Sequence, residues 1–147
     1  MLQFLLKKSI PQSEVCLNTN LQAKAVRVTL NKPLTICSIY IAPTENFTKQ
    51  QLIDVHDQLK PPFLILGDFN AHSPLWEKKC QESDTRAKII EDFLIQSNSC
   101  LLNDLSPTHI DATSFKKSSI DLSFCHPDFV SDFEWFSMTF MILIIFQ

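Results

Sequence analysis

A chain of 147 residues is long enough for one domain with a hydrophobic core, and its 45% apolar content excludes a chain that is disordered by composition. The formal net charge of -3 gives no sign of attachment to nucleic acid through bulk positive charge, although a nuclease need not be basic overall. Gly67 is the only glycine, so tight turns must be built largely from Asn, Asp and Ser.

The cysteines and the two ends of the chain predict an intracellular location, nuclear or cytoplasmic. The five cysteines form no C-x-x-C pair, and we expect reduced, mostly buried thiols. Residues 1–8 carry their lysines after the apolar run, unlike a secretory signal, so we expect no secretion. The uncharged run 135–146 is shorter than the about 20 residues of a transmembrane helix. No membrane partner is therefore expected.

Apolar periodicity predicts helices and strands in a mixed order. The first and second full strands lie close enough to form an antiparallel hairpin, and Pro61 and Pro62 end the first helix. In chain order, the predicted elements are a strand within 1–8, strands over 25–30 and 34–41, a helix from 48 to 59, a strand over 63–66, a helix from 84 or 85 to 97, and strands over 100–102 and 120–125. Hairpins mixed with helical crossovers predict an α/β sandwich of mixed sheets instead of a parallel doubly wound sheet.

A run of polar residues follows the buried strand 63–66. It reads Gly67-Asp68-Phe69-Asn70. A carboxylate and an amide two positions apart point to one side of an extended chain, beside an apolar wall where metal or phosphate chemistry gains strength. This pattern favours a phosphodiester-cleaving site at Asp68 and Asn70. An ordinary Gly-Asp/Asn turn is the alternative that the tetrapeptide leaves open.

Three further polar residues lie at or near the ends of predicted strands. Tyr40 ends one strand, Thr108 follows Pro107, and Asp121 lies within an apolar strand. Alone, Tyr40 is typical of a core-edge tyrosine and Thr108 of a turn. Asp121 is harder to dismiss, because a buried carboxylate needs a histidine, an arginine or a metal as its partner.

In this order, the motifs resemble the endonuclease/exonuclease/phosphatase superfamily, and within it the endonuclease domain of jockey-type non-LTR retrotransposons. The resemblance covers 4–135. It implies an incomplete four-layer α/β sandwich of mixed, largely antiparallel sheets, Mg²⁺-dependent hydrolysis of DNA phosphodiesters, and a reverse transcriptase domain in the parent element. The matching segments are Ser-Ile-Pro, Ile-Tyr, Pro-Pro-Phe-Leu-Ile-Leu-Gly-Asp-Phe-Asn-Ala-His, Leu-Leu-Asn-Asp, Pro-Thr and Ser-Ile-Asp-Leu.

The resemblance also implies a role for each residue of the site. Asp68 would orient or deprotonate the attacking water, or help to hold the metal, and Asn70 would position the phosphate or that water. Tyr40 and Thr108 would hydrogen-bond phosphate oxygens. Asp121 would orient a catalytic histidine through its ring N–H.

The chain departs from the family pattern at its beginning. The family's strands bearing Asn and the metal-ligand Glu precede the point that matches Phe4. Glu14 follows Ser-Ile-Pro in a predicted turn, and we do not accept it as that ligand. One carboxylate and one amide hold Mg²⁺ poorly because the ion gives up its waters reluctantly. We also expect an uncovered sheet edge, an uncovered apolar face and poor solubility.

The family's closing Ser-Asp-His is absent from 136–147. One codon choice for 138–147 is ATG ACT TTC ATG ATT CTG ATC ATT TTC CAA, which read two bases later gives Asp-Phe-His-Asp-Ser-Asp-His-Phe-Pro. We therefore expect a partial endonuclease domain over 1–135, followed by an apolar tail over 136–147 produced by a frameshift. Among the remaining histidines, His72 is the one that could approach the cleft. His109 and His126 are interpreted as turn residues and His56 as lying on a helix surface.

Three functions stay open. The leading hypothesis is a degenerate, inactive fragment of a retrotransposon-derived, Mg²⁺-dependent DNA endonuclease domain. The second is a weakly active nuclease that uses Asp68, Asn70, Tyr40 and Thr108. The third is a non-enzymatic remnant that binds nucleic acid or protein through Lys7, Lys8, Lys116, Lys117 and Trp76.

Overall fold

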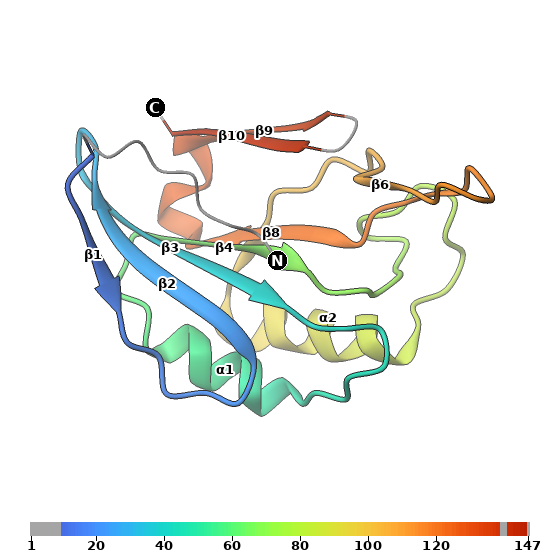
Figure 1. Ribbon diagram of the computed structural model, residues 1–147, viewed down its shortest axis with the longest axis horizontal. Helices are drawn as coiled ribbons and strands as arrows, with labels where there is room; N and C mark the ends of the chain where they lie inside the picture. The colour runs from blue at the N-terminus through green and yellow to red at the C-terminus, as the bar shows by residue number, and fades with distance from the viewer. Residues whose placement is uncertain (1–9, 139–140, 147) are drawn as a thin grey trace.

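The computed structural model describes residues 10–138 and 141–146. It is a mixed α/β structure in which a six-stranded sheet separates a helical layer from smaller β-elements (Figure 1). None of the helices within this part of the chain is long and apolar enough to cross a bilayer. The elements are β1 (Gln12–Val15), β2 (Gln22–Thr29), β3 (Pro33–Tyr40), α1 (Lys49–Asp57), β4 (Phe63–Asp68), α2 (Thr85–Ser97), β5 (Cys100–Leu101), β6 (His109–Ile110), β7 (Lys117–Ser118), β8 (Asp121–Cys125), the 3₁₀ helix η1 (Pro127–Asp132), β9 (Phe133–Met138) and β10 (Met141–Phe146).

The large sheet has the strand order β1-β2-β3-β4-β8-β5. Only the β3–β4 pair is parallel, because α1 makes the crossover between these two strands. The other pairs are antiparallel, as are the two-stranded sheets β6–β7 and β9–β10. The predicted mixed, largely antiparallel α/β architecture is thus confirmed, including the β2–β3 hairpin.

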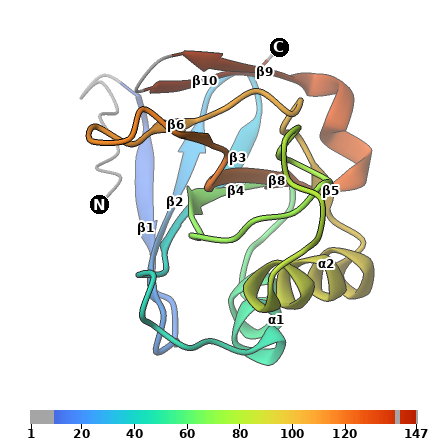
Figure 2. The same cartoon turned by 90° about the vertical axis from the view of Figure 1, so that its right-hand side faces the viewer.

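Both faces of the large sheet are covered (Figure 2). α1 and α2 lie against one face, where Cys37, Ile65 and Phe124 belong to the main core. A second core lies on the opposite face and joins Val28, Leu34, Leu64 and Cys125 to Phe133 of β9. The two-residue alternation of the strands supplies both cores, because successive side chains point to opposite faces.

Local signals account for the two helices. Thr48 caps α1 as predicted, and it forms a capping box with Gln51. Asp84, one of the two residues left open, caps α2 by accepting a hydrogen bond from the N–H of Ala87. Asn98 ends α2 in the left-handed conformation, a position that glycine often fills in other proteins.

Several predicted boundaries were wrong. β4 extends through Gly67 and Asp68, two residues beyond the predicted end, so these residues belong to the strand and not to a turn. Glu14 lies in β1, paired with Val26, and not in a turn. The sequence reading missed the short strands β6 and β7 and also missed η1, β9 and β10. The domain boundary expected at 135/136 falls within the range of β9 but stays a prediction, and the strand expected within 1–8 lies outside the described residues.

The thiols and His56 differ in part from expectation. All five cysteines are free, but only Cys37 and Cys125 are buried. Burial raises the pKa of each of these two thiols to about 12, which keeps them protonated at neutral pH. His56 is not a surface residue, since its half-buried ring packs edge-on against Phe63 at a centroid distance of 5.1 Å.

Candidate functional site

Tyr40, Asp68 and Asp121 lie side by side at one end of the large sheet. Asp68 of β4 is in register with Tyr40 of the parallel strand β3 and with Asp121 of the antiparallel strand β8. Directly paired residues present their side chains on the same face of a sheet. All three residues are half-buried. The two carboxylates therefore share one partly desolvated site with the phenol.

Gly67 allows the strands to approach closely at this site. A Cβ atom at position 67 would overlap the carbonyl oxygen of Ile39 on β3. Gly67 pairs with Ile39 directly before Tyr40 pairs with Asp68. The single glycine is thus needed for close strand packing and not for a turn, and it fixes the spacing between Tyr40 and Asp68.

Asn70 is the second residue of the loop after β4, and it hydrogen-bonds Asp68. Its backbone has φ 47°, in the left-handed region that asparagine tolerates. The Asn70 N–H donates to Asp68 Oδ1 at 3.1 Å, and Asn70 Nδ2 donates to the carbonyl oxygen of Ile41 at 3.0 Å. Asp68 therefore ends β4 and begins an Asx-type turn, and the predicted phosphodiester-cleaving role of these residues stays a prediction.

Thr108 directly precedes β6 and forms hydrogen bonds with residues of β7 and β8. The N–H of Asp121 donates to Thr108 Oγ1 at 3.1 Å, and the N–H of Thr108 donates to the carbonyl oxygen of Ser118 at 2.9 Å. All five residues predicted from the sequence are therefore brought together at this end of the sheet.

The two carboxylates have raised pKa values. Burial raises the pKa of Asp68 most, and the nearby charge of Asp121 raises it further, while the Asn70 N–H and the charge of His109 oppose the shift. Burial likewise raises the pKa of Asp121, against the Thr108 hydrogen bond and His109. Two carboxylates in one partly buried site disfavour joint ionisation. Such a pair is typical of functional sites.

His109 is the histidine whose charge lowers the pKa of both carboxylates. This role was not predicted from the sequence. His109 lies on β6 directly after Thr108 and is exposed, so its interpretation as a turn residue was wrong. The signal available in the sequence was its position next to Thr108. His72 instead hydrogen-bonds the carboxylate of Glu77, with 2.7 Å between Nδ1 and Oε2. His126 caps η1 by accepting from the N–H of Asp128.

Arg86 also escaped the sequence reading. Its guanidinium group donates to the carbonyl oxygens of Phe69 at 2.9 Å, Glu45 at 2.7 Å and Ile41 at 3.2 Å. The Ile41 carbonyl is the same oxygen that accepts from Asn70. Arg86 therefore links the loops that follow β3 and β4 by hydrogen bonds, next to Asn70 of the candidate site.

Trp76 cannot serve as an exposed contact for nucleic acid, which corrects an expectation of the third functional hypothesis. Its side chain is fully buried, with 0% exposure, and its Nε1–H donates to the carbonyl oxygen of Ala71 at 3.1 Å. Lys7 and Lys8, named in the same hypothesis, lie outside the described residues. Lys116 and Lys117 are exposed.

The donor groups present fit Mg²⁺ only in part. Within 10–138 and 141–146, no group of three or more Asp, Glu, His or Cys side chains could hold a metal ion. Asp68 and Asn70 supply one carboxylate and one amide, and Glu14 is exposed on β1, paired with the strand beyond β3. Mg²⁺ keeps its waters unless several well-placed oxygens replace them. These side chains alone therefore form an incomplete magnesium site.

Comparison with known proteins defines the lineage of this site. The family model for endonuclease-reverse transcriptases matches residues 34–140, which is most of the chain and includes all five predicted site residues. The chain belongs to this family. The resemblance inferred from the motifs is thereby confirmed.

Solved structures show the same fold. Twelve solved chains match, and one of them is the endonuclease domain of TRAS1, a telomere-specific non-LTR retrotransposon. The similarity to it has a TM-score of 0.79 at 20% sequence identity and covers 96% of this chain and 70% of that one. At this identity the similarity establishes the fold alone. No curated protein matches the chain.

Proposed function

We propose that this domain binds DNA phosphodiesters at the site formed by Tyr40, Asp68, Asn70, Thr108 and Asp121, and that it hydrolyses them at most weakly. The proposal places it among retrotransposon endonuclease domains as a catalytically reduced member, working on DNA beside a reverse transcriptase. The observation that carries the proposal is the register of Tyr40, Asp68 and Asp121 across β3, β4 and β8.

The phosphate would be held by neutral hydrogen-bonding groups. The Tyr40 hydroxyl has no hydrogen-bond partner within the described chain, which leaves it able to donate to a phosphate oxygen. Asn70 is fixed by its two hydrogen bonds to Asp68 and Ile41, so its position does not depend on the ligand. Such preorganisation lowers the entropic cost of binding.

Hydrolysis would need more than these groups supply. In phosphodiester hydrolysis a water oxygen attacks phosphorus, its proton goes to a base, and the bond to the leaving oxygen breaks. Asp68 is placed to accept that proton, and its raised pKa favours proton uptake. However, the negative charges of Asp68 and Asp121 repel a phosphate unless a cation offsets them, and the present donors hold Mg²⁺ weakly. We therefore expect no hydrolysis above the background rate.

An active nuclease is the second candidate. It is favoured by the intact hydrogen bonds of Asn70 to Asp68 and of Thr108 to Asp121, which keep the site ordered. A non-enzymatic protein-binding role has no comparable observation in its favour. The choice between the first two therefore depends on measured cleavage.

A plasmid-nicking assay with Mg²⁺ separates the two candidates. The wild-type chain and Asp68→Ala are incubated with supercoiled DNA at protein concentrations that saturate binding. We expect the two proteins to nick at the same background rate. Mg²⁺-dependent nicking that Asp68→Ala abolishes would establish the active nuclease instead. Sequencing the encoding DNA tests the frameshift separately, because that hypothesis requires Ser-Asp-His to be encoded in another frame at 138–147.

A further inference from the structure

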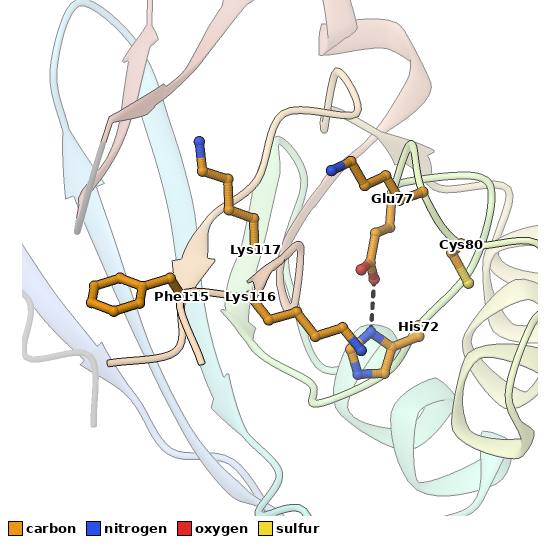
Figure 3. Close-up of a pocket in the computed structure, with 7 residues that line it drawn as sticks. His72, Glu77, Cys80, Phe115, Lys116 and Lys117 are labelled. Atoms are coloured by element: carbon orange, nitrogen blue, oxygen red, sulfur yellow. Dashed lines mark hydrogen bonds and ion pairs between the residues drawn. The ribbon is translucent and has the colours of Figure 1, made fainter. Parts of the chain in front are cut away.

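A cavity with several charged side chains in its walls lies near the candidate site. It has a volume of about 470 Å³ and is lined by His72, Glu77, Lys79, Cys80, Phe115, Lys116 and Lys117 (Figure 3). Its walls come from the loop after β4 and from the tip of the β6–β7 hairpin. None of these residues belongs to the site described above.

The cavity adjoins that site through both of its walls. His72 follows Asn70 by two residues, and Lys117 precedes Ser118, whose carbonyl oxygen accepts from the N–H of Thr108. The cavity is therefore placed to receive a neighbouring phosphate of the same duplex.

The charge of the cavity suits an anion. Lys79, Lys116 and Lys117 contribute three ammonium groups, whereas Glu77 contributes the single carboxylate. That carboxylate is mostly buried and engaged by His72, and no ion pair within the described residues neutralises the three lysines. Figure 3 shows the Lys116 side chain extending toward the His72 ring, whereas Phe115 points away from it. This is a local positive site on a chain whose net charge is -3.

Hydrogen bonds within the protein hold both walls of the cavity in place. Asp111 holds the hairpin tip by accepting from the N–H groups of Thr113 and Ser114 and from the Ser114 hydroxyl. On the opposite wall, the N–H of His72 donates to Asp84 Oδ2 at 3.0 Å, and the buried Trp76 anchors the loop. Because these hydrogen bonds fix the backbone of both walls, less conformational entropy is lost when the lysines bind an anion.

We infer that the cavity lined by Lys79, Lys116 and Lys117 is a second phosphate site that holds the DNA backbone beside the phosphate at the candidate site. The inference rests on the proposed DNA binding and deepens it. The lysines contact the backbone, so they add affinity without base specificity. Glu77 opposes this attraction and limits the affinity.

A salt titration of DNA binding tests the inference. A fluorescent duplex is titrated with the wild-type chain, with Lys79→Ala/Lys116→Ala/Lys117→Ala, and with the control Lys24→Ala/Lys60→Ala/Lys88→Ala. The control removes the same charge from exposed lysines that do not line the cavity. Because each lost phosphate contact lowers the slope of log K against log salt by about 0.9, we expect the cavity variant to lose about 0.9 of slope and at least tenfold in affinity. Equal losses in the two triple variants would overturn the inference.

Glu77→Gln provides a test that misfolding cannot imitate. The amide keeps the shape of the side chain and removes the only carboxylate of the cavity, so we expect DNA affinity to rise several-fold. Unchanged or weaker binding would contradict the second phosphate site. If the wild-type chain does not bind the duplex at all, the proposed function fails as well. If the wild-type chain binds the duplex but the cavity triple variant has the same affinity and salt slope as the control triple variant, the second phosphate site fails and the proposed function stands.

Discussion

Asp68 and Asp121 lie directly opposite each other on the antiparallel strands β4 and β8. Burial raises the pKa of both, and the charge of Asp121 raises that of Asp68 further. Each carboxyl group thus binds its proton more tightly in the folded chain than in the unfolded one. The pair is tolerated in the fold at a cost to stability whenever both groups are ionised.

The first prediction concerns stability and pH. A raised folded pKa favours the folded state at low pH, and this contribution is lost as pH rises from the ordinary aspartate value of 3.8 through the raised values. Asp121→Asn cannot ionise, so the variant does not lose this stability as pH rises. We therefore expect its Tm to exceed the wild-type Tm by a few degrees at neutral pH, and the difference between the two Tm values to vanish toward about pH 4. Asp92→Asn, at an exposed position on α2, is the control, and its Tm should equal the wild-type Tm both at neutral pH and near pH 4. A neutral-pH Tm for Asp121→Asn below that of wild type would contradict the prediction.

The second prediction concerns His109, whose charge lowers the pKa of both carboxylates. We expect His109→Asn to raise both pKa values, because the substitution removes the opposing positive charge. Carboxyl chemical shifts followed by NMR through a pH titration report the two groups separately. Unaltered titration curves for Asp68 and Asp121 would show that His109 does not act on the pair.

The third prediction concerns Gly67, where a Cβ atom would overlap the Ile39 carbonyl oxygen. The overlap is with backbone of the neighbouring strand, so relief requires β3 and β4 to separate. We expect Gly67→Ala to lower the free energy of unfolding by at least about 3 kcal/mol. Chemical denaturation measures the loss, and a loss below about 1 kcal/mol would mean that the strands yield easily.

The fourth prediction concerns Arg86 and the carbonyl groups of Ile41, Glu45 and Phe69 that it binds. Arg86→Met keeps much of the apolar stem but leaves these acceptors without their charged donor. We expect a loss of about 2–4 kcal/mol in stability. Lys88→Met, at an exposed position of the same helix, is the matched control and should cost less than about 0.5 kcal/mol. Equal losses would rule out a role for Arg86 in tying the loops together.

Local patterns predicted the parts of the fold that depend on local physics. The Thr48 cap, the β2–β3 hairpin and the buried run into Asp68 each carry their signal within a few residues. Family motifs then placed Tyr40, Thr108 and Asp121 near one another. The sequence could not reveal Arg86, because its partners are backbone carbonyls up to 45 residues away, and any residue offers such an acceptor.

Other misses have equally physical reasons. β6 and β7 contain two residues each, too few for an alternating pattern to show. Trp76 resembled an exposed aromatic contact within a polar loop, yet the loop folds around it as a core residue. The charged cavity combines two loops that lie about forty residues apart, so only the folded chain brings its lysines together.

The most direct test of the central claim, that a DNA phosphate binds beside Asp68, is the DNA affinity of Asp68→Asn measured in EDTA. Without a divalent cation, the Asp68 carboxylate repels a bound phosphate by about 1 kcal/mol, which corresponds to roughly fivefold in Kd. The account predicts that Asp68→Asn binds the duplex about fivefold more tightly than wild type, whereas Asp92→Asn, a control with the same charge change, binds almost as wild type does. Equal affinities for Asp68→Asn and Asp92→Asn would contradict it.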